Sequence, residues 1–319
     1  MKLIAELCQN HNGNIKILNE LVKAAAKSGA SHVKIQHIYS KNLSKRVIFE
    51  KGLKQGNKTL FIKRPYITEY KRLKKLELTK SQIKDFIKLC KAHSVVPLTT
   101  CFTRKDIEEI RDLGFNEIKV ASYDCSSYPM LKELKKNFNH IYLSTGASFN
   151  CEIETASNIL KKNFSLLHCV TQYPTDLYNL NFARLDYLKK FTGNVGYSDH
   201  TNPTKDKLLS SMASIYFGAK ILERHFTVLD KNLTKDGVVS VNPKELSDIY
   251  NFSRIDRQNQ LKVLKKKKFN KKKLLGVTNP KMSNEEFNNR NYYRGRFVSK
   301  VIDKRGEIII NNWEETLLK

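Results

Sequence analysis

Short apolar runs alternate with helical segments along most of the chain. Eight runs have the length and composition of buried strands, and they cover residues 3–8, 32–36, 95–102, 117–122, 141–146, 165–171, 195–200 and 219–227. The segments between successive runs place apolar residues at the 3.6-residue spacing of an amphipathic helix. The pattern therefore predicts a strand followed by a helix, repeated along the chain.

Three of the connecting helices have clear boundaries. The first carries its apolar face over residues 15–26 and ends at Gly29, as is common because glycine readily adopts the conformation that follows a helix. The second is expected to begin with Thr103 as its N-cap and to end at Gly114. The third starts after Asn242, with a proline in its first turn.

The number of strands distinguishes two kinds of α/β fold. Eight βα units that close on themselves form a TIM barrel of roughly 260 residues, whereas an open doubly wound sheet would use fewer strands and a glycine-rich first turn. The chain contains no G-x-G-x-x-G motif. We therefore predict an α/β fold with a (β/α)8 barrel over residues 1–260, a basic linker over 261–285 and a small segment over 286–319.

Function in such a barrel gathers at the carboxyl ends of the strands. Lys34 and Lys119 lie in predicted strands and alternate with apolar neighbours, so both lysines are expected to point into the barrel while the neighbours face the helices. Buried lysines need anionic partners. Hydroxyl groups end the neighbouring strands, on Thr100, Ser122, Ser144 and Ser198. Together these groups predict a pocket for a phosphate and a carboxylate.

Two histidines stand at the ends of the last two strands, His200 after Ser198-Asp199 and His225 after Glu223-Arg224. A lone histidine at a strand end is usually a satisfied core or loop side chain. Two of them on neighbouring strands of one barrel, beside inward-facing lysines, predict ligands of a single metal ion.

The chain is strongly basic, with a formal net charge of +27, which would permit binding to nucleic acid. The lysines are scattered, however, and their densest clusters, at 265–268 and 271–273, lie after the predicted barrel. No aromatic-interleaved motif accompanies them. A solvated linker is therefore favoured over a polyanion site, and no nucleic acid partner is expected.

Other composition signals concern the compartment. The six cysteines show no C-x-x-C spacing, and the chain has no stretch of about 18 apolar residues. The apolar run at the N-terminus is too short for a signal peptide. We expect a soluble, cytoplasmic protein with reduced thiols and no membrane partner.

Nine motifs together resemble the sialic acid synthase family. They are IAE at 4–6, NHNG at 10–13, VKIQ at 33–36, IKVAS at 118–122, LSTG at 143–146, LLHC at 166–169, YPT at 173–175, GYSDHT at 196–201 and LERHFT at 222–227. The resemblance implies an enzyme that condenses phosphoenolpyruvate with N-acetylmannosamine or a related N-acetylated amino sugar. The implied products are phosphate, released by C–O cleavage, and a nine-carbon 2-keto-3-deoxy acid.

The resemblance also implies roles for particular residues. The expected catalytic residues are Glu6, Lys34, Lys119 and Glu223. The expected phosphoenolpyruvate ligands are Lys34, Thr100, Lys119, Ser122, Ser144 and Ser198. The expected sugar contacts are Gln36, Asp124, Tyr173 and Asp236, and Glu6 would also face the sugar. His200 and His225 would hold a divalent cation, Mn²⁺ ahead of Mg²⁺ or Co²⁺, because imidazole with oxygen ligands suits Mn²⁺ better than Mg²⁺.

Residues 294–307 resemble the start of the antifreeze-like domain that, in the family's domain-swapped homodimer, covers the partner's active site. A homodimer is therefore expected. The Lys-Arg-Pro-Gly type segment that follows in the family has no counterpart, so the antifreeze-like segment is expected to be truncated. About thirty residues are too few for an independent core, and we expect them to pack on a barrel or a partner, or to be partly disordered.

Three positions depart from the family pattern: Asp124 stands where glutamate is common, Cys101 replaces a proline, and 234–237 replaces a Gly-Pro-Asp type loop. These departures allow a different acceptor, such as one leading to legionaminic or pseudaminic acid. Other hypotheses stay open at this point. They are a Schiff-base aldolase using Lys34 or Lys119 as nucleophile, a catalytically inactive relative, and a polyanion-binding relative.

Overall fold

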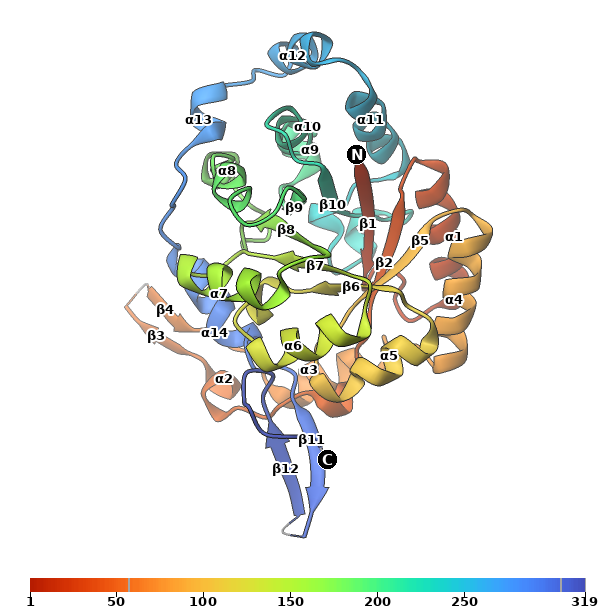
Figure 1. Cartoon of the computed structure of the whole chain (residues 1–319), viewed down its shortest axis with the longest axis vertical. Coiled ribbons are helices and arrows are strands. Elements are labelled where there is room, and N and C mark those ends of the chain that lie inside the picture. Colours follow the sequence, from red (N-terminus) through yellow and green to blue (C-terminus); the bar gives the residue numbers. More distant parts are fainter. Residues whose placement is uncertain (57, 305, 319) are drawn as a thin grey trace.

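Eight parallel strands close into a barrel in the computed structural model, which describes residues 1–56, 58–304 and 306–318 (Figure 1). The strands follow one another around the barrel in the order β1-β10-β9-β8-β7-β6-β5-β2. Their bounds are β1 Lys2–Cys8, β2 His32–Gln36, β5 Val96–Thr100, β6 Glu117–Val120, β7 His140–Ser144, β8 Phe164–Cys169, β9 Val195–Asp199 and β10 Ile221–His225. The predicted α/β barrel is confirmed.

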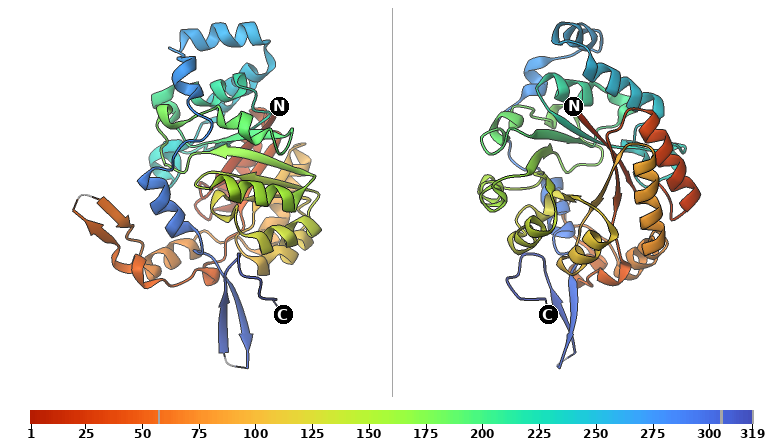
Figure 2. Two further views of the ribbon diagram at one scale, coloured as in Figure 1. Left: turned by 60° about the vertical axis from the view of Figure 1, so that its left-hand side comes forward. Right: turned by 45° about the vertical axis from the view of Figure 1, so that its right-hand side comes forward.

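Helices surround the barrel on its outer side, as the turned views show (Figure 2). Their bounds are α1 Ile15–Lys27, α4 Lys80–Ala92, α5 Ile107–Leu113, α6 Tyr128–Asn137, α7 Asn150–Leu160, α8 Arg184–Leu188, α9 Pro203–Asp206, α10 Leu209–Tyr216 and α11 Pro243–Arg254. An excursion between β2 and α4 adds the elements α2 Val47–Lys51, β3 Leu53–Gln55, β4 Lys58–Phe61 and α3 Tyr66–Lys74. The antiparallel strands β3 and β4 project away from the barrel (Figure 2).

Local capping explains where the predicted helices begin. The side chain of Asn14 accepts hydrogen bonds from the first turn of α1, and Asn242 forms a capping box at the start of α11. Thr103 stands at the N-cap of the 3₁₀ turn that leads into α5, so the expected start of this segment is confirmed, but its side chain makes no capping hydrogen bond. Its hydroxyl donates to Asp106 Oδ2 instead, at 2.6 Å, and a 3₁₀ turn precedes α5. The hydroxyl satisfies a buried carboxylate rather than a backbone N–H.

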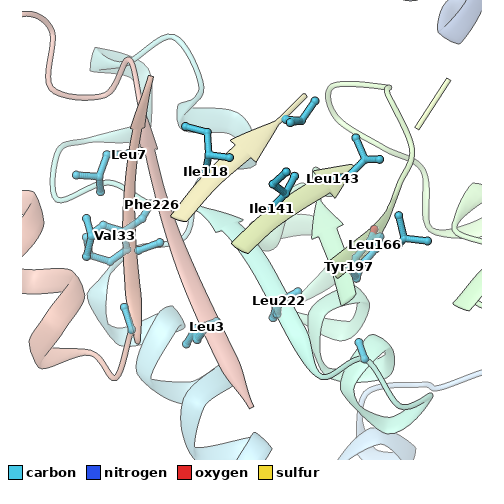
Figure 3. Close-up of a cluster of buried hydrophobic side chains, with 14 of the residues drawn as sticks. Leu3, Leu7, Val33, Ile118, Ile141, Leu143, Leu166, Tyr197, Leu222 and Phe226 are labelled. Carbon is cyan, nitrogen blue, oxygen red and sulfur yellow. The ribbon is translucent and has the colours of Figure 1, made fainter. Parts of the chain in front are cut away.

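Outward-facing residues of the strands form the main hydrophobic core against the helices (Figure 3). The labelled residues of this layer are Leu3, Leu7, Val33, Ile118, Ile141, Leu143, Leu166, Tyr197, Leu222 and Phe226. A second cluster lies inside the barrel and consists of Ile4, Leu98, Tyr142, Leu167 and Ile221. Since successive side chains of a strand point to opposite faces, the residues two positions further along these strands also face the interior. They are Glu6, Thr100, Ser144, Cys169 and Glu223.

Polar groups close the amino end of the barrel beneath this interior cluster. Tyr142 donates a hydrogen bond to Glu117 at 2.7 Å and accepts one from Lys2 at 2.7 Å, while His32 lies 3.1 Å from the same carboxylate. The interior is therefore stacked in layers, with a polar base, an apolar middle and a charged upper layer. The upper layer opens into a cavity lined by candidate functional groups.

The chain after α11 continues with three helices and a hairpin. Their bounds are α12 Arg257–Lys266, α13 Lys271–Leu275, α14 Asn284–Tyr293, β11 Ser299–Asp303 and β12 Gly306–Ile310. The lysine-rich stretch thus lies mostly on α12 and α13, and the divisions at 260 and 285 stay predictions. The final segment packs on the barrel: Val298 N donates to Asn42 O at 2.9 Å, and Lys105 N donates to Ser299 Oγ at 3.1 Å.

Two further observations concern the cysteines and the length of the helices. All six cysteines are free. Among the described residues, no helix has both the length and the apolar composition needed to cross a lipid bilayer.

Leu167→Ala tests the interior layer, because Leu167 is fully buried inside the barrel. The truncation leaves a cavity that the surrounding strands cannot collapse, so we expect the free energy of unfolding to fall by about 2–5 kcal/mol. Urea unfolding followed by circular dichroism measures the loss. Leu317→Ala is the matched control, since Leu317 is 69% exposed, and it should change stability by less than about 0.5 kcal/mol. Equal effects of the two changes would contradict the layered interior.

Candidate functional site

A cavity of about 470 Å³ opens at the carboxyl ends of the barrel strands. All fourteen candidate residues from the sequence line it: Glu6, Lys34, Gln36, Thr100, Lys119, Ser122, Asp124, Ser144, Tyr173, Ser198, His200, Glu223, His225 and Asp236. The roles expected for them stay predictions. Their assembly in one cavity shows that the inward positions of the strands were correctly identified.

Lys34 lies at the centre of a buried charge cluster on β1, β2 and β10. Its ammonium group forms an ion pair with Glu6, donates to Thr100 Oγ1 at 3.0 Å and lies 3.6 Å from Glu223 Oε2. Burial acts to lower the pKa of Lys34, but the charges of Glu223 and Glu6 outweigh it and raise this pKa above its usual value. Lys34 therefore stays a fixed cation.

Lys119 occupies the opposite side of the same cluster. Its Nζ donates to Ser144 Oγ at 2.6 Å and lies 4.0 Å from Glu223 Oε1, which also accepts a hydrogen bond from Ser198 Oγ at 2.8 Å. Burial lowers the pKa of Lys119, although Glu223 opposes this shift. The charge of Lys119 is thus less completely compensated than that of Lys34, which pairs with both Glu6 and Glu223.

Glu223 balances both lysines. Burial alone would raise its pKa, but the charges of Lys119 and Lys34, together with the Ser198 hydroxyl, lower it to about 2. Its Oε2 atom is buried and accepts no hydrogen bond from the described residues. An incoming anion could therefore compete with this carboxylate for the two ammonium groups without breaking a network around Oε2.

The two predicted metal ligands lie side by side at the cavity wall. The rings of His200 and His225 have centroids 5.4 Å apart, and the ring of Tyr173 packs at a tilt against His200, with centroids 4.2 Å apart. His200 Nδ1 lies 3.3 Å from Val170 O. Burial and the nearby His225 lower the pKa of His200 to about 3, so its ring is neutral at physiological pH, which is the form that binds metal ions.

A tighter group of potential ligands includes only one of these histidines. The ligand atoms of Cys8, His225 and Asp236 all lie within 4.8 Å of one another. His225 Nδ1 and Asp236 Oδ2 are 3.9 Å apart, and both are buried without a hydrogen-bond partner among the described residues. Buried polar atoms of proteins are nearly always paired. A nitrogen and an oxygen atom with unmet partners, beside a sulfur atom, fit a divalent cation.

The strand ends that carry these groups are fixed from outside the barrel. Arg224 is fully buried, lies 2.5 Å from Asp199 Oδ1 and donates to the carbonyl of Thr201 at 2.9 Å. Because Arg224 points outward between its two neighbours, Glu223 and His225 point inward. The Arg224 network thus ties the end of β10 to the end of β9.

A glycine fixes the loop that carries Asp236. A Cβ atom on Gly237 would lie only 1.8 Å from Lys231 O, so no other residue fits without moving the loop. The 3₁₀ turn Gly237–Val239 follows directly, with Asp236 at its N-cap position. This close approach holds the Asp236 carboxylate beside His225.

The expected sugar contacts differ in how freely they face the cavity. Gln36, Tyr173 and Asp236 line it directly. The Asp124 carboxylate already accepts hydrogen bonds from Ser127 at 2.8 Å and from Asn312 at 3.0 Å. Asn312 belongs to the C-terminal segment, so that segment takes up an oxygen that was expected to contact substrate.

Sequence reasoning missed other residues of the cavity wall. They are Cys8, Gln9, Arg64, Arg72, Phe102, Ala121, Tyr123, Cys169, Pro174, Lys235, Val238, Val239, Glu285, Asn289, Tyr293, Arg296 and Phe297. The signal for Cys8 was available, since it stands two residues after Glu6 on one strand. The aromatic contacts of Tyr123 with Tyr293, at 4.9 Å, and of Phe102 with Phe297, at 5.1 Å, join segments far apart in the chain. No local sequence pattern predicts contacts between such distant segments.

A family model and the curated relatives that match the sequence indicate one family. The NeuB family model matches residues 21–264. The N,N'-diacetyllegionaminic acid synthase of Campylobacter jejuni is 32% identical over 318 residues, covering 96% of this chain and 86% of that protein. The enzyme of the same name from Legionella pneumophila is 30% identical over 257 residues, covering 77% and 69%. Among solved structures, the spore coat polysaccharide biosynthesis protein SpsE of Bacillus subtilis has a TM-score of 0.72, with 21% identity, over 97% of this chain and 84% of that chain. The structural likeness concerns the fold alone.

Glu223→Gln tests the charge balance of the buried cluster. The change leaves two buried lysines facing a single carboxylate, Glu6, so we expect the free energy of unfolding at pH 7 to fall by about 3–5 kcal/mol. Chemical denaturation measures it. Asp186→Asn is the control, because it breaks the exposed pair of Asp186 with Lys189, and should cost less than about 1 kcal/mol. A Glu223→Gln protein as stable as the control variant would refute the cluster.

Proposed function

Because the chain belongs to the NeuB family of nonulosonic acid synthases, we propose that it condenses phosphoenolpyruvate with a six-carbon N-acetylated aldose. The products are phosphate and a nine-carbon 2-keto-3-deoxy acid. One observation carries the proposal: two buried lysines and a set of hydroxyl groups lie in the same cavity as a cluster of metal-ligand side chains. That cavity offers an anion site next to a site that can activate a carbonyl group.

Phosphoenolpyruvate carries a phosphate and a carboxylate, and both need cationic partners in a buried site. Lys34 and Lys119 supply the charge, and the hydroxyl groups of Thr100, Ser122, Ser144 and Ser198 supply further donors around them. Thr100 and Ser144 already bind the two ammonium groups, so they hold the lysines in position before the substrate arrives. On binding, the substrate anion replaces Glu223 as the partner of the lysines.

The imidazole groups of His200 and His225 supply candidate ligands for a divalent cation, and we propose Mn²⁺ ahead of Mg²⁺ or Co²⁺. A bound cation would polarise the aldehyde oxygen of the sugar. The chain's own part is to hold the open-chain aldose with its carbonyl carbon next to C3 of phosphoenolpyruvate. Gln36, Tyr173 and Asp236 line the side of the cavity where the sugar hydroxyls would lie.

The reaction needs one new carbon–carbon bond and one molecule of water. C3 of phosphoenolpyruvate bonds to the aldehyde carbon, the water oxygen bonds to C2, and the bond between C2 and the bridging oxygen breaks to release phosphate. Lys34 and Lys119 stabilise the phosphate as its charge develops. Glu6 holds Lys34 at the cavity floor and is placed to bind the attacking water or a sugar hydroxyl.

The acceptor class follows from the chemistry of the relatives' products. Phosphoenolpyruvate contains no nitrogen, so an enzyme named for N,N'-diacetyllegionaminic acid must take both acetamido groups from its sugar. We propose an acceptor with at least one acetamido group for this chain. N-Acetylmannosamine and a sugar with two acetamido groups are the two candidates that a direct assay separates.

Phosphate release tests the synthase proposal. We expect phosphate to appear only when phosphoenolpyruvate, Mn²⁺ and an N-acetylated aldose are all present, with mass spectrometry identifying the keto acid. Oxygen-18 in the bridging position of phosphoenolpyruvate should leave with the phosphate, because the C–O bond breaks. No release with any aldose of a panel, or label retained in the keto acid, would overturn the proposal.

A second experiment addresses the Schiff-base aldolase hypothesis. Treatment with borohydride in the presence of pyruvate should trap no covalent adduct on the protein, and a trapped adduct would favour the aldolase.

Lys119→Ala tests the anion site. The lost hydrogen bond between charged groups is worth about 1.5–3 kcal/mol, so the phosphoenolpyruvate concentration for half-maximal rate should rise at least tenfold. Steady-state kinetics at saturating sugar measure it. Lys244→Ala removes an exposed lysine of α11, 86% accessible in its side chain, and should leave this concentration unchanged. An unchanged value in Lys119→Ala would remove Lys119 from the anion site.

A further inference from the structure

We propose that Cys8 supplies a sulfur ligand to the metal site, together with His225 and Asp236, and that the site therefore binds thiophilic cations such as Zn²⁺ or Co²⁺ more tightly than Mg²⁺. The role of the ion in catalysis rests on the proposed function. The existence of the metal site does not depend on that function. This ligand set differs from the prediction made from the sequence, in which His200 and His225 hold the metal and Asp236 contacts the sugar.

Three separate segments bring the ligands together. Cys8 ends β1, His225 ends β10, and Asp236 stands at the N-cap of the turn Gly237–Val239. Strands β1 and β10 are neighbours, with Glu6 in register with His225. The cluster is thus formed by barrel closure and by a loop held in place at Gly237.

The spacing suits one ion. Two atoms bound to the same tetrahedral zinc ion, at about 2.0–2.3 Å each, lie about 3.3–3.8 Å apart. His225 Nδ1 and Asp236 Oδ2 already lie 3.9 Å apart, and all three ligand atoms lie within 4.8 Å of one another. Closing the longest of these separations by about 1 Å, which side-chain rotation can supply, brings all three atoms onto one cation.

The unmet hydrogen bonds point to a ligand. His225 is 7% exposed, yet its Nδ1 atom has no hydrogen-bond partner in the described part of the chain. Asp236 Oδ2 is also buried and has no hydrogen-bond partner in the described part of the chain. A cation between them would satisfy both atoms at once, and a thiolate from Cys8 would neutralise part of its charge.

The backbone places the thiol there at a steric cost. Cys8 has a φ of +45°, a conformation that glycine adopts freely and other residues rarely adopt. The pairing of β1 with β2 also shifts register between Glu6 and Cys8, and Cys8 N donates to Glu6 Oε1 at 2.7 Å. The side chain is only 5% exposed. The turn thus directs a buried sulfur atom toward His225 and Asp236 rather than toward solvent.

Sulfur changes which ion is preferred. Thiolate is a soft ligand that favours Zn²⁺ and Co²⁺, whereas Mg²⁺ prefers oxygen ligands in octahedral geometry. A simpler arrangement has the Cys8 thiol donating a hydrogen bond to Asp236 with no part in metal binding. The two arrangements differ in whether the sulfur bonds to the ion, and this difference has a spectroscopic signature.

Titration of the metal-free full chain with Co²⁺ tests the proposal through the near-ultraviolet charge-transfer absorption of a cobalt–thiolate bond. We expect the band in the wild-type protein and in Cys101→Ser and Cys169→Ser, and its loss in Cys8→Ser. Cys101 is a buried thiol at the end of β5 outside the cavity wall, whereas Cys169 lines the cavity, with Sγ 3.7 Å from His200 Nδ1. Zn²⁺ affinity, measured by competition with a chelating dye, should fall at least tenfold in Cys8→Ser while Mg²⁺ affinity changes less than threefold.

The outcomes separate this site from the synthase reaction. A band that persists in Cys8→Ser, a band lost in Cys169→Ser, or no band in the wild-type protein would each overturn the sulfur ligand. Cys8→Gly serves as a second variant, because glycine accepts the positive φ without strain, and a folded Cys8→Gly that keeps the band would overturn it too. A wild-type protein with the band but without phosphate release from phosphoenolpyruvate would overturn the synthase function and leave the metal site standing.

Discussion

The buried charges of Lys34 and Lys119 constrain the rest of the structure. Each ammonium group is almost fully buried, and neither can remain there without carboxylates in contact. Those carboxylates come from Glu6 on β1 and Glu223 on β10, which are far apart in sequence but close together in the closed barrel. An open sheet with β1 and β10 at opposite edges would separate them. Barrel closure and charge balance therefore depend on each other.

The alternation of side chains along β10 separates the charged residues that line the cavity from the charged residue that stabilises the strand from outside. Glu223 and His225 face the cavity, while Arg224 between them faces outward and binds Asp199 and Thr201. A slip of one residue in this strand would bury Arg224 beside the two lysines and expel Glu223. The outward ion pair thus enforces the register on which the inward site depends. This is why a charged, fully buried residue stands next to two site residues without lining the cavity.

Features set by residues close together in the sequence could be predicted from it, whereas features set by contacts between distant segments could not. Strand alternation is local, so the inward positions of Lys34, Lys119 and Glu223 could be inferred from period-two patterns alone. Thr103 occupies the expected N-cap position, but its hydroxyl is oriented to donate to the Asp106 carboxylate three residues away and caps no backbone N–H. The register shift at Cys8, and the cavity contacts of Tyr293 and Arg296, arise from pairing and packing between distant segments. No single-sequence pattern records these.

The C-terminal segment forms part of the cavity wall, next to segments that are distant from it in the sequence. Tyr293 stacks on Tyr123, Arg296 lies 2.7 Å from Glu69, and Asn312 donates to Asp124. These contacts place side chains from α14 and beyond over the mouth of the chain's own barrel. Under the proposed function, the barrel floor binds phosphoenolpyruvate, which is the same substrate whatever the acceptor sugar. Discrimination between acceptors must therefore come from the rim, where the excursion between β2 and α4 meets the C-terminal segment.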